Sequence, residues 1–162
     1  MTSGGPPRAA APATAGWKRL SRADRRRLVA AIREAERGNR AEVGVHLEAR
    51  YPGDGPLARA RELFVRLELD RTRDGTGVLL YVAVEDRRAA VWAGPGLVGA
   101  TAPDFWKDAV AEVAAGFRDG DGVGGLVRAL ALIGDRARTV AGGEDTAGNE
   151  RPDRVSFGPG VR

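Results

Sequence analysis

The segment Val78–Val84, with the sequence VLLYVAV, most restricts how this 162-residue chain can fold. It is a continuous apolar run of strand length, and a strand directs successive side chains to opposite faces of its sheet. Because both faces of this strand are apolar, both must be covered inside the protein. We therefore expect helices on both faces of a sheet, which is a three-layer α/β/α sandwich of the α/β class.

Further strands flank this run in the sequence. In residues 42–49 the apolar side chains of Val43, Val45, Leu47 and Ala49 alternate with those of Glu42, Gly44, His46 and Glu48. This alternation predicts a strand with one apolar face. Residues 89–93 predict a strand that forms a hairpin with the central run across the turn Glu85–Arg88. Val155–Phe157 is expected to dock back on the body, and the sheet is expected to be small and mixed.

Four segments carry apolar side chains at helical spacing. The first begins at Ser21, where Asp24 three residues on resembles a capping box, and ends near Gly38. The other three are centred on residues 57–67, 106–117 and 126–137. With the strands they give the order α-β-α-β-β-α-α.

The stretch Gly120–Gly125, GDGVGG, satisfies the pattern G-x-G-x-x-G and, with Asp119, the opening of a calcium loop. A dinucleotide fingerprint requires a strand before its glycines, but a predicted helix precedes them here. A calcium loop requires an oxygen ligand at its fifth position and glutamate at its twelfth, where this chain has Val123 and Leu130. We interpret the stretch as a helix–helix connector with Gly120 at a left-handed helix end, the alternative being an incidental ion contact.

Composition excludes several kinds of site. The chain has no cysteine and one histidine, which excludes disulfides, thiolate zinc sites, cysteine nucleophiles and multi-histidine metal sites. No apolar run approaches the roughly 20 residues that cross a bilayer, so no membrane span is expected. The N-terminal residues lack the charged and apolar regions of a secretory signal, and we expect a cytoplasmic protein.

The net charge of +4 is unevenly distributed. Residues 1–27 hold seven basic residues and one acidic residue, whereas the rest holds 19 basic and 21 acidic residues. The body is therefore nearly neutral, and no nucleic-acid partner is expected, although the basic head alone could touch nucleic acid or anionic lipid. We expect a disordered head over residues 1–20, one domain over 21–157 with a flexible segment at 142–153, and a short C-terminal end at 158–162.

Three groups of polar residues could carry chemistry within the folded elements. His46 could act as a general base, although a lone histidine on a strand is more often a hydrogen-bonded structural residue. At the hairpin turn, Glu85 or Asp86 could bind a cation and Arg87 an anion, or the turn could simply be solvated. Asp104 and Asp108 could share a divalent ion, but Asp104 is better explained as a helix cap. Outside these elements, Asn149, Glu150 and Asp153 offer oxygen ligands, or only solubility.

Several blocks, in order, give the chain a resemblance to the TPM domain family over roughly residues 21–157. They are Ala41–Val45, Leu63–Leu67 with Thr72, Gly77–Ala83, Asp86–Arg87, Phe105–Lys107, Gly116–Leu126 and Asn149–Asp153. The resemblance implies an α/β/α sandwich. It also implies the divalent-cation binding seen in some members and the phosphatase activity attributed to plant relatives.

Two functions follow as expectations. The first is a non-catalytic module that binds a protein partner or ligand. The second is a weak phosphatase in which Glu42 and Asp86 hold Ca²⁺ or Mg²⁺ and Arg87 stabilises phosphate charge, with Asn149 and Glu150 as further ligands. Where the family often has Gly-Asp after the third strand, this chain has Ala93-Gly94. That missing acid favours the binding module.

Overall fold

The computed structural model describes residues 19–97, 99–100, 102–143 and 155–162. Its elements in chain order are α1 (Arg22–Glu36), β1 (Glu42–Glu48), α2 (Pro56–Arg66), the 3₁₀ turn η1 (Leu69–Arg71), β2 (Gly77–Ala83), β3 (Arg88–Ala93), the 3₁₀ turn η2 (Pro103–Trp106), α3 (Lys107–Asp119), α4 (Gly122–Ala141) and β4 (Val155–Phe157). The predicted helices and strands are all present. None of the helices in these described ranges is both long and apolar enough to cross a membrane.

The four strands form one small mixed sheet, as expected from the sequence. Their order is β3-β2-β1-β4. β1 runs parallel to both β2 and β4, whereas β2 and β3 form an antiparallel hairpin. Because β1 pairs with Gly77 at its first residue, Glu42, and with Ala83 at its last, Glu48, the start of β1 lies beside the start of β2. This register later decides which candidate residues can meet.

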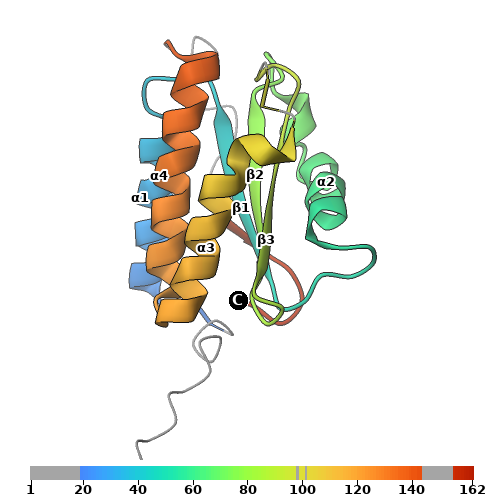
Figure 1. The fold of residues 1–162 in the computed structure, drawn as a ribbon, viewed down its shortest axis with the longest axis vertical. Coiled ribbons are helices and arrows are strands. Elements are labelled where there is room, and N and C mark those ends of the chain that lie inside the picture. Colours follow the sequence, from blue (N-terminus) through green and yellow to red (C-terminus); the bar gives the residue numbers. More distant parts are fainter. Residues whose placement is uncertain (1–18, 98, 101, 144–154) are drawn as a thin grey trace, which may run out of the picture.

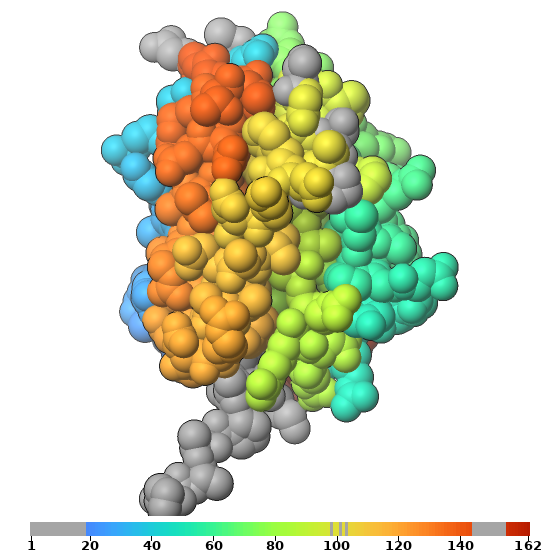
Figure 2. Space-filling model, viewed as in Figure 1, coloured from blue at the N-terminus to red at the C-terminus, as the bar shows by residue number. Residues whose placement is uncertain are grey.

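Helices cover both faces of the sheet, so the predicted three-layer architecture is confirmed (Figure 1). α1, α3 and α4 lie on one side, and α2 lies on the other. All seven residues of β2 are buried. Leu80 belongs to the core under the three helices, and its neighbours Leu79 and Tyr81 belong to the core under α2. In Figure 2 the β3 side of the hairpin remains visible between α3 and α2, consistent with β3 as an edge strand.

The polar side of β1 is buried as well as its apolar side. The alternation predicted one apolar face, which Val43, Val45 and Leu47 form in the main core, and the opposite, polar face is also covered. On its polar face Glu42 is 2% exposed, His46 5% and Glu48 1%. Charged groups are not normally buried without partners. The partners that permit this burial for His46 and Glu48 lie on α2, β2 and β4, as described below.

Local caps fix the helix ends, and they confirm the connector prediction for the glycine-rich stretch. Ser21 Oγ accepts a hydrogen bond of 3.0 Å from Asp24 N–H at the start of α1. Gly120 ends α3 with a left-handed φ of 71°. Asp121 caps α4 by accepting a hydrogen bond of 3.1 Å from Gly124 N–H, so this acid serves the helix start.

The packed body is longer than the expected range of 21–157. Leu20 and Val161 are both buried in the main core, and the Leu20 N–H donates a 2.8 Å hydrogen bond to the Arg162 carbonyl. Beyond β4 the chain continues beside β1, because Ala49 N–H donates to the Pro159 carbonyl at 3.0 Å. The expected head lies outside the described residues up to position 18, as does most of the expected flexible segment, from position 144 onward.

Candidate functional site

Five polar side chains from four elements meet on the α2 side of the sheet, near the carboxyl ends of the parallel strands. They are His46 and Glu48 of β1, Arg59 of α2, Tyr81 of β2 and Ser156 of β4, and we call them the polar cluster. The two-residue repeat of a strand puts His46 and Glu48 on the same face. The parallel register then sets Tyr81 and Ser156 on either side of His46.

The centre of the polar cluster is a bidentate ion pair between Glu48 and Arg59. Arg59 Nε donates to Glu48 Oε1 at 2.8 Å, and Arg59 Nη2 donates to Oε2 at 3.0 Å. The Tyr81 hydroxyl also donates to Oε1. Because the two charged side chains are only 10% and 2% exposed, water screens this pair weakly. Both carboxylate oxygens are therefore already occupied by donors of the protein.

His46 lies between the ion pair and the edge strand. Its Nδ1 is 2.8 Å from Ser156 Oγ, and its Nε2 is 3.9 Å from Glu48 Oε2, which is too long for a hydrogen bond. Among the described residues Nε2 has no hydrogen-bond partner. The Ser156 hydroxyl also donates to the Val45 carbonyl at 3.4 Å. It can therefore accept from Nδ1–H while donating to that carbonyl, or donate to Nδ1 when the ring proton is on Nε2.

The electrostatics of the polar cluster favour a neutral histidine beside an ionised glutamate. Burial lowers the pKa of His46, and the nearby Glu48 carboxylate only partly opposes this effect. Burial alone raises the pKa of Glu48, but hydrogen bonds from Arg59 and Tyr81 outweigh it, so the pKa lies below its usual value. Burial and the hydrogen bond to Glu48 raise the pKa of Tyr81. At neutral pH these groups form one ion pair whose carboxylate oxygens are both hydrogen-bonded, beside a neutral imidazole whose Nε2 has no hydrogen-bond partner among the described residues.

This arrangement offers little for acid–base or metal chemistry. A general base needs a free lone pair within reach of a substrate, but the oxygens of Glu48 are engaged and His46 is 5% exposed. Within the part of the chain that the structure describes, no three His, Cys, Asp or Glu side chains are grouped so that they could hold a metal ion. The polar cluster is therefore better suited to fixing β1, β2, β4 and α2 to one another.

The structure does not bring the two expected cation ligands together. Glu42 begins β1 beside Thr76, whose carbonyl accepts its backbone N–H. Asp86 follows β2 and accepts a 2.8 Å hydrogen bond from the Tyr51 N–H, beyond the end of β1. Six residues of strand separate these two ends, about 20 Å at 3.3 Å per residue. A cation shared by Glu42 and Asp86 is thus excluded, which corrects the pairing expected from the sequence.

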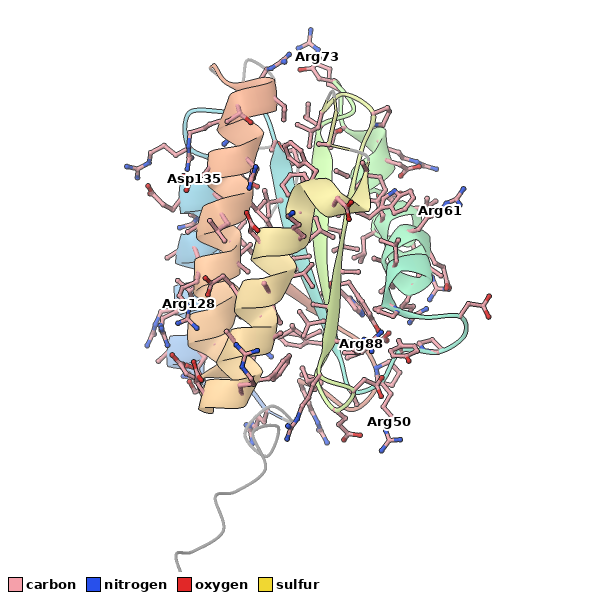
Figure 3. All side chains as sticks on the ribbon, in the orientation of Figure 1. Arg50, Arg61, Arg73, Arg88, Arg128 and Asp135 are labelled. Atoms are coloured by element: carbon pink, nitrogen blue, oxygen red, sulfur yellow. The ribbon has the colours of Figure 1, made fainter. Side chains whose placement is uncertain are left out.

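Figure 3 shows the same separation through two labelled arginines: Arg73, just before β2, and Arg50, just after β1, lie at opposite ends of the molecule. Near Arg50, the turn residue Glu85 accepts a 2.9 Å hydrogen bond from Arg50 Nε. Arg87 has a left-handed φ of 53° at the turn. Its side chain is exposed to solvent.

The remaining expected ligands do not join these residues. Asp108 pairs with Arg136 at 2.6 Å, within the α3–α4 surface. Asn149, Glu150 and Asp153 lie outside the described residues. Ligand binding by Glu42, Asp86 or Arg87 individually, or by Asn149 and Glu150, stays a prediction.

Sequence reasoning missed Arg59, Tyr81 and Ser156 as partners of His46 and Glu48. One signal was available: Glu42, His46 and Glu48 are charged or titratable residues in a strand next to a fully apolar one. Such a strand is normally buried, and a buried carboxylate requires a cation. The arginine that supplies this cation is decided by how α2 packs on the sheet, and the sequence alone does not reveal that packing.

A second feature is an open groove between α1 and β4, on the side of β4 away from the polar cluster. It has a volume of about 540 Å³. Its apolar lining is Val29, Ala30, Val155 and Phe157, and its basic rim is Arg25, Arg26 and Arg33. The Arg25 guanidinium carbon lies 4.6 Å from the centre of the Phe157 ring. We call this feature the α1–β4 groove.

The layers and the sheet order define the protein as an α/β/α sandwich built on a small mixed sheet. Residues 17–136 match the TPM domain, and the chain therefore belongs to the TPM domain family. This confirms the resemblance seen in the sequence. The comparison with curated proteins found no match for the chain.

Solved structures agree with this assignment. The chain is similar to the BA42 protein of the psychrophilic bacterium Bizionia argentinensis, with 29% identity, a TM-score of 0.74 and coverage of 86% of this chain and 95% of that one. The N-terminal domain of a protein from P. gingivalis has 17% identity and a TM-score of 0.63 over 74% and 77% of the two chains. The N-terminal domain of cg2496 from Corynebacterium glutamicum has 16% identity and a TM-score of 0.57 over 85% and 90%. The last two matches concern the fold alone.

Proposed function

We propose that this TPM domain is a non-catalytic module that binds a protein partner. The observation that carries the proposal is the contrast between its two polar features. In the polar cluster, Glu48 is fully engaged by Arg59 and Tyr81, so it serves the fold. The α1–β4 groove instead presents apolar side chains and a basic rim to solvent, which is the composition of a partner-binding surface.

The competing function is a divalent-metal-assisted phosphatase. A metal ion in such an enzyme polarises the phosphoryl oxygen and needs several carboxylate or carbonyl ligands around one point. Asp86 and Arg87 share the hairpin turn. This proximity supports the phosphatase, because a carboxylate that binds a cation and an arginine that binds phosphate would lie side by side. Against it, Asp86 already accepts a hydrogen bond from Tyr51 N–H, and Glu42 lies at the far end of the sheet.

Thermal melting separates these two functions. The purified protein is melted with Ca²⁺, Mg²⁺, Mn²⁺ or chelator, and hydrolysis of p-nitrophenyl phosphate is measured in the same solutions. A cation at a hundredfold excess over Kd stabilises the folded state by about 2.7 kcal/mol, which is a shift of several degrees for a domain of this size. We expect no cation-dependent shift and no hydrolysis.

Two variants sharpen the test. Asp86→Ala removes the carboxylate at the hairpin turn, and Asp70→Ala, an exposed acid on η1, is the matched control. Asp86→Ala also loses the hydrogen bond to Tyr51 N–H, so the comparison is the shift caused by each cation and not the absolute melting temperature. A shift and hydrolysis that Asp86→Ala abolishes and Asp70→Ala retains would replace the binding module with the phosphatase.

A further inference from the structure

The α1–β4 groove combines an open strand edge, an apolar lining and a row of arginines. This inference rests on the proposed role as a binding module. We propose that the partner bound in the α1–β4 groove is an acidic, extended segment of another protein. This segment adds to the sheet as a fifth strand beside β4 and places its carboxylates against Arg26 and Arg33. Strand addition of this kind takes affinity from main-chain hydrogen bonds and specificity from alternate side chains.

The strand edge supplies the main-chain partners. β4 is the last strand of the order β3-β2-β1-β4, so one of its edges faces away from the sheet. The Gly158 N–H donates to the Leu47 carbonyl of β1 at 2.8 Å. Because backbone groups alternate in direction along a strand, those of Val155 and Phe157 point to the outer edge. Among the described residues no strand pairs with this outer edge, and an edge of this kind is a template for another strand.

The arginines supply the charge that selects an acidic segment. Arg26, Ala30 and Arg33 follow one another at helical spacings of four and three residues on α1, so they form one stripe beside β4. Arg26 and Arg33 are two turns apart, about 10 Å along the helix. Side chains two and four residues apart share one face of an extended chain at about 7 and 13 Å, so the long side chains of glutamates four residues apart can reach both arginines. Among the described residues, neither arginine has an ion-pair partner within 4.0 Å, so their charges are available to carboxylates.

Arg25 and the apolar lining favour a peptide over a polyanion such as nucleic acid. The Arg25 guanidinium lies over Phe157, and a stacked guanidinium keeps its in-plane N–H donors free for a carboxylate. Val29 and Val155 offer an apolar patch between the arginines. Single-stranded nucleic acid instead requires exposed aromatic rings for base stacking along a continuous basic groove. Phe157, the aromatic ring of this groove, is already covered by Arg25.

The test uses the peptide Thr-Glu-Thr-Val-Thr-Glu-Thr, blocked at both ends, which places two carboxylates and one valine on a single face of a strand. It is titrated into the ¹⁵N-labelled full chain and followed by amide chemical shifts and hydrogen exchange. We expect the amides of Val155 and Phe157 to shift and to become protected. The same peptide with lysine in place of glutamate is expected not to bind.

Variants assign the two parts of the proposal. Arg26→Glu with Arg33→Glu is expected to weaken peptide binding by at least about tenfold, because like charges then face each other. The matched control, Arg27→Glu with Arg118→Glu, changes the charge equally at exposed residues outside the groove and is expected to bind as the parent does. Val155→Pro removes one outward N–H at the first residue of β4, where proline is tolerated, and is also expected to weaken binding. Thermal melting confirms that each variant is folded.

Several outcomes would overturn the proposal. They are peptide binding that leaves the β4 amides unchanged, equal binding by Val155→Pro, no binding at millimolar peptide, and tighter binding of an oligothymidylate in the same groove. None of them affects the proposed non-catalytic role, because cation-dependent melting and phosphate hydrolysis decide that role separately.

Discussion

Replacing Arg59 with methionine removes the cation that neutralises the buried Glu48 carboxylate while keeping most of the side-chain volume. Arg59 makes two hydrogen bonds to Glu48, at 2.8 and 3.0 Å, from a side chain that is 10% exposed. Breaking a buried pair by removing one partner costs about 3–5 kcal/mol, because the remaining charge is left without compensation. At about 2–4 °C per kcal/mol for a protein of this size, the melting temperature should fall by roughly 6–20 °C.

The same helix offers a matched control. Arg66 pairs with Glu62 at 2.6 Å, but these side chains are 62% and 50% exposed. An exposed pair contributes at most about 1 kcal/mol, so Arg66→Met should change the free energy of unfolding by less than that. Urea denaturation at neutral pH measures both variants, with equal m-values as the check that the unfolded states are comparable.

A double variant completes the cycle. Glu48→Gln removes the buried negative charge and keeps an acceptor for the Tyr81 hydroxyl. Combined with Arg59→Met it should restore much of the lost stability, because no unpaired charge then remains in the interior. If Arg59→Met costs no more than Arg66→Met, or if the two changes at the polar cluster simply add, water screens the pair and our account of the buried network is wrong.

Three further predictions concern other parts of the fold. Burial lowers the pKa of His46 below its ordinary 6.5. The contribution of the neutral imidazole to stability is therefore complete above pH 6.5 and is lost as the pH falls through the lowered folded pKa. His46→Gln should flatten the slope of the unfolding free energy against pH below 6.5, and an unchanged slope would show that another group titrates there. A Cβ added at Gly125 would lie 2.8 Å from the Gly116 Cα, so Gly125→Ala should cost about 1–3 kcal/mol in thermal melting by forcing α3 and α4 apart; an unchanged melting temperature would contradict this close approach. Asn39→Ala removes two hydrogen bonds: one of 2.7 Å from the Asn39 amide to the Ala35 carbonyl in α1, and one of 2.8 Å that the side-chain oxygen accepts from Ala41 N–H. The free energy of unfolding measured in urea should fall by about 1–3 kcal/mol. A fall below about 0.5 kcal/mol would show that water replaces these hydrogen bonds.

Periodicity predicted the elements well because it reflects burial directly. The run Val78–Val84 implied a strand covered on both faces, and β2 is buried throughout. The same reasoning was less complete for β1. Alternation tells which residues share a face, but it does not tell whether water or protein covers that face. His46 and Glu48 are buried because Arg59, eleven positions beyond Glu48, turns inward from α2, and this choice depends on tertiary packing.

The candidate cation pair shows what strand direction adds to a sequence prediction. Glu42 precedes most of β1, and Asp86 follows β2. In an antiparallel pair these two positions would lie at the same end of the sheet. Because β1 and β2 are parallel, they lie at opposite ends. The sequence predicted both strands but not their relative direction, so it could not exclude the shared site.

The position of β4 has a consequence for how the chain is made. β1 is an inner strand, but its outer neighbour comes from residues 155–157, more than a hundred positions later. At a synthesis rate of about 5–20 residues per second, roughly 5–20 s pass between the addition of Glu48 and the addition of Val155 to the chain. For at least that time β1 lacks the partner strand that β4 later supplies on this edge. A chaperone that recognises extended chain therefore has a defined interval in which to act, and completion of β4 ends it.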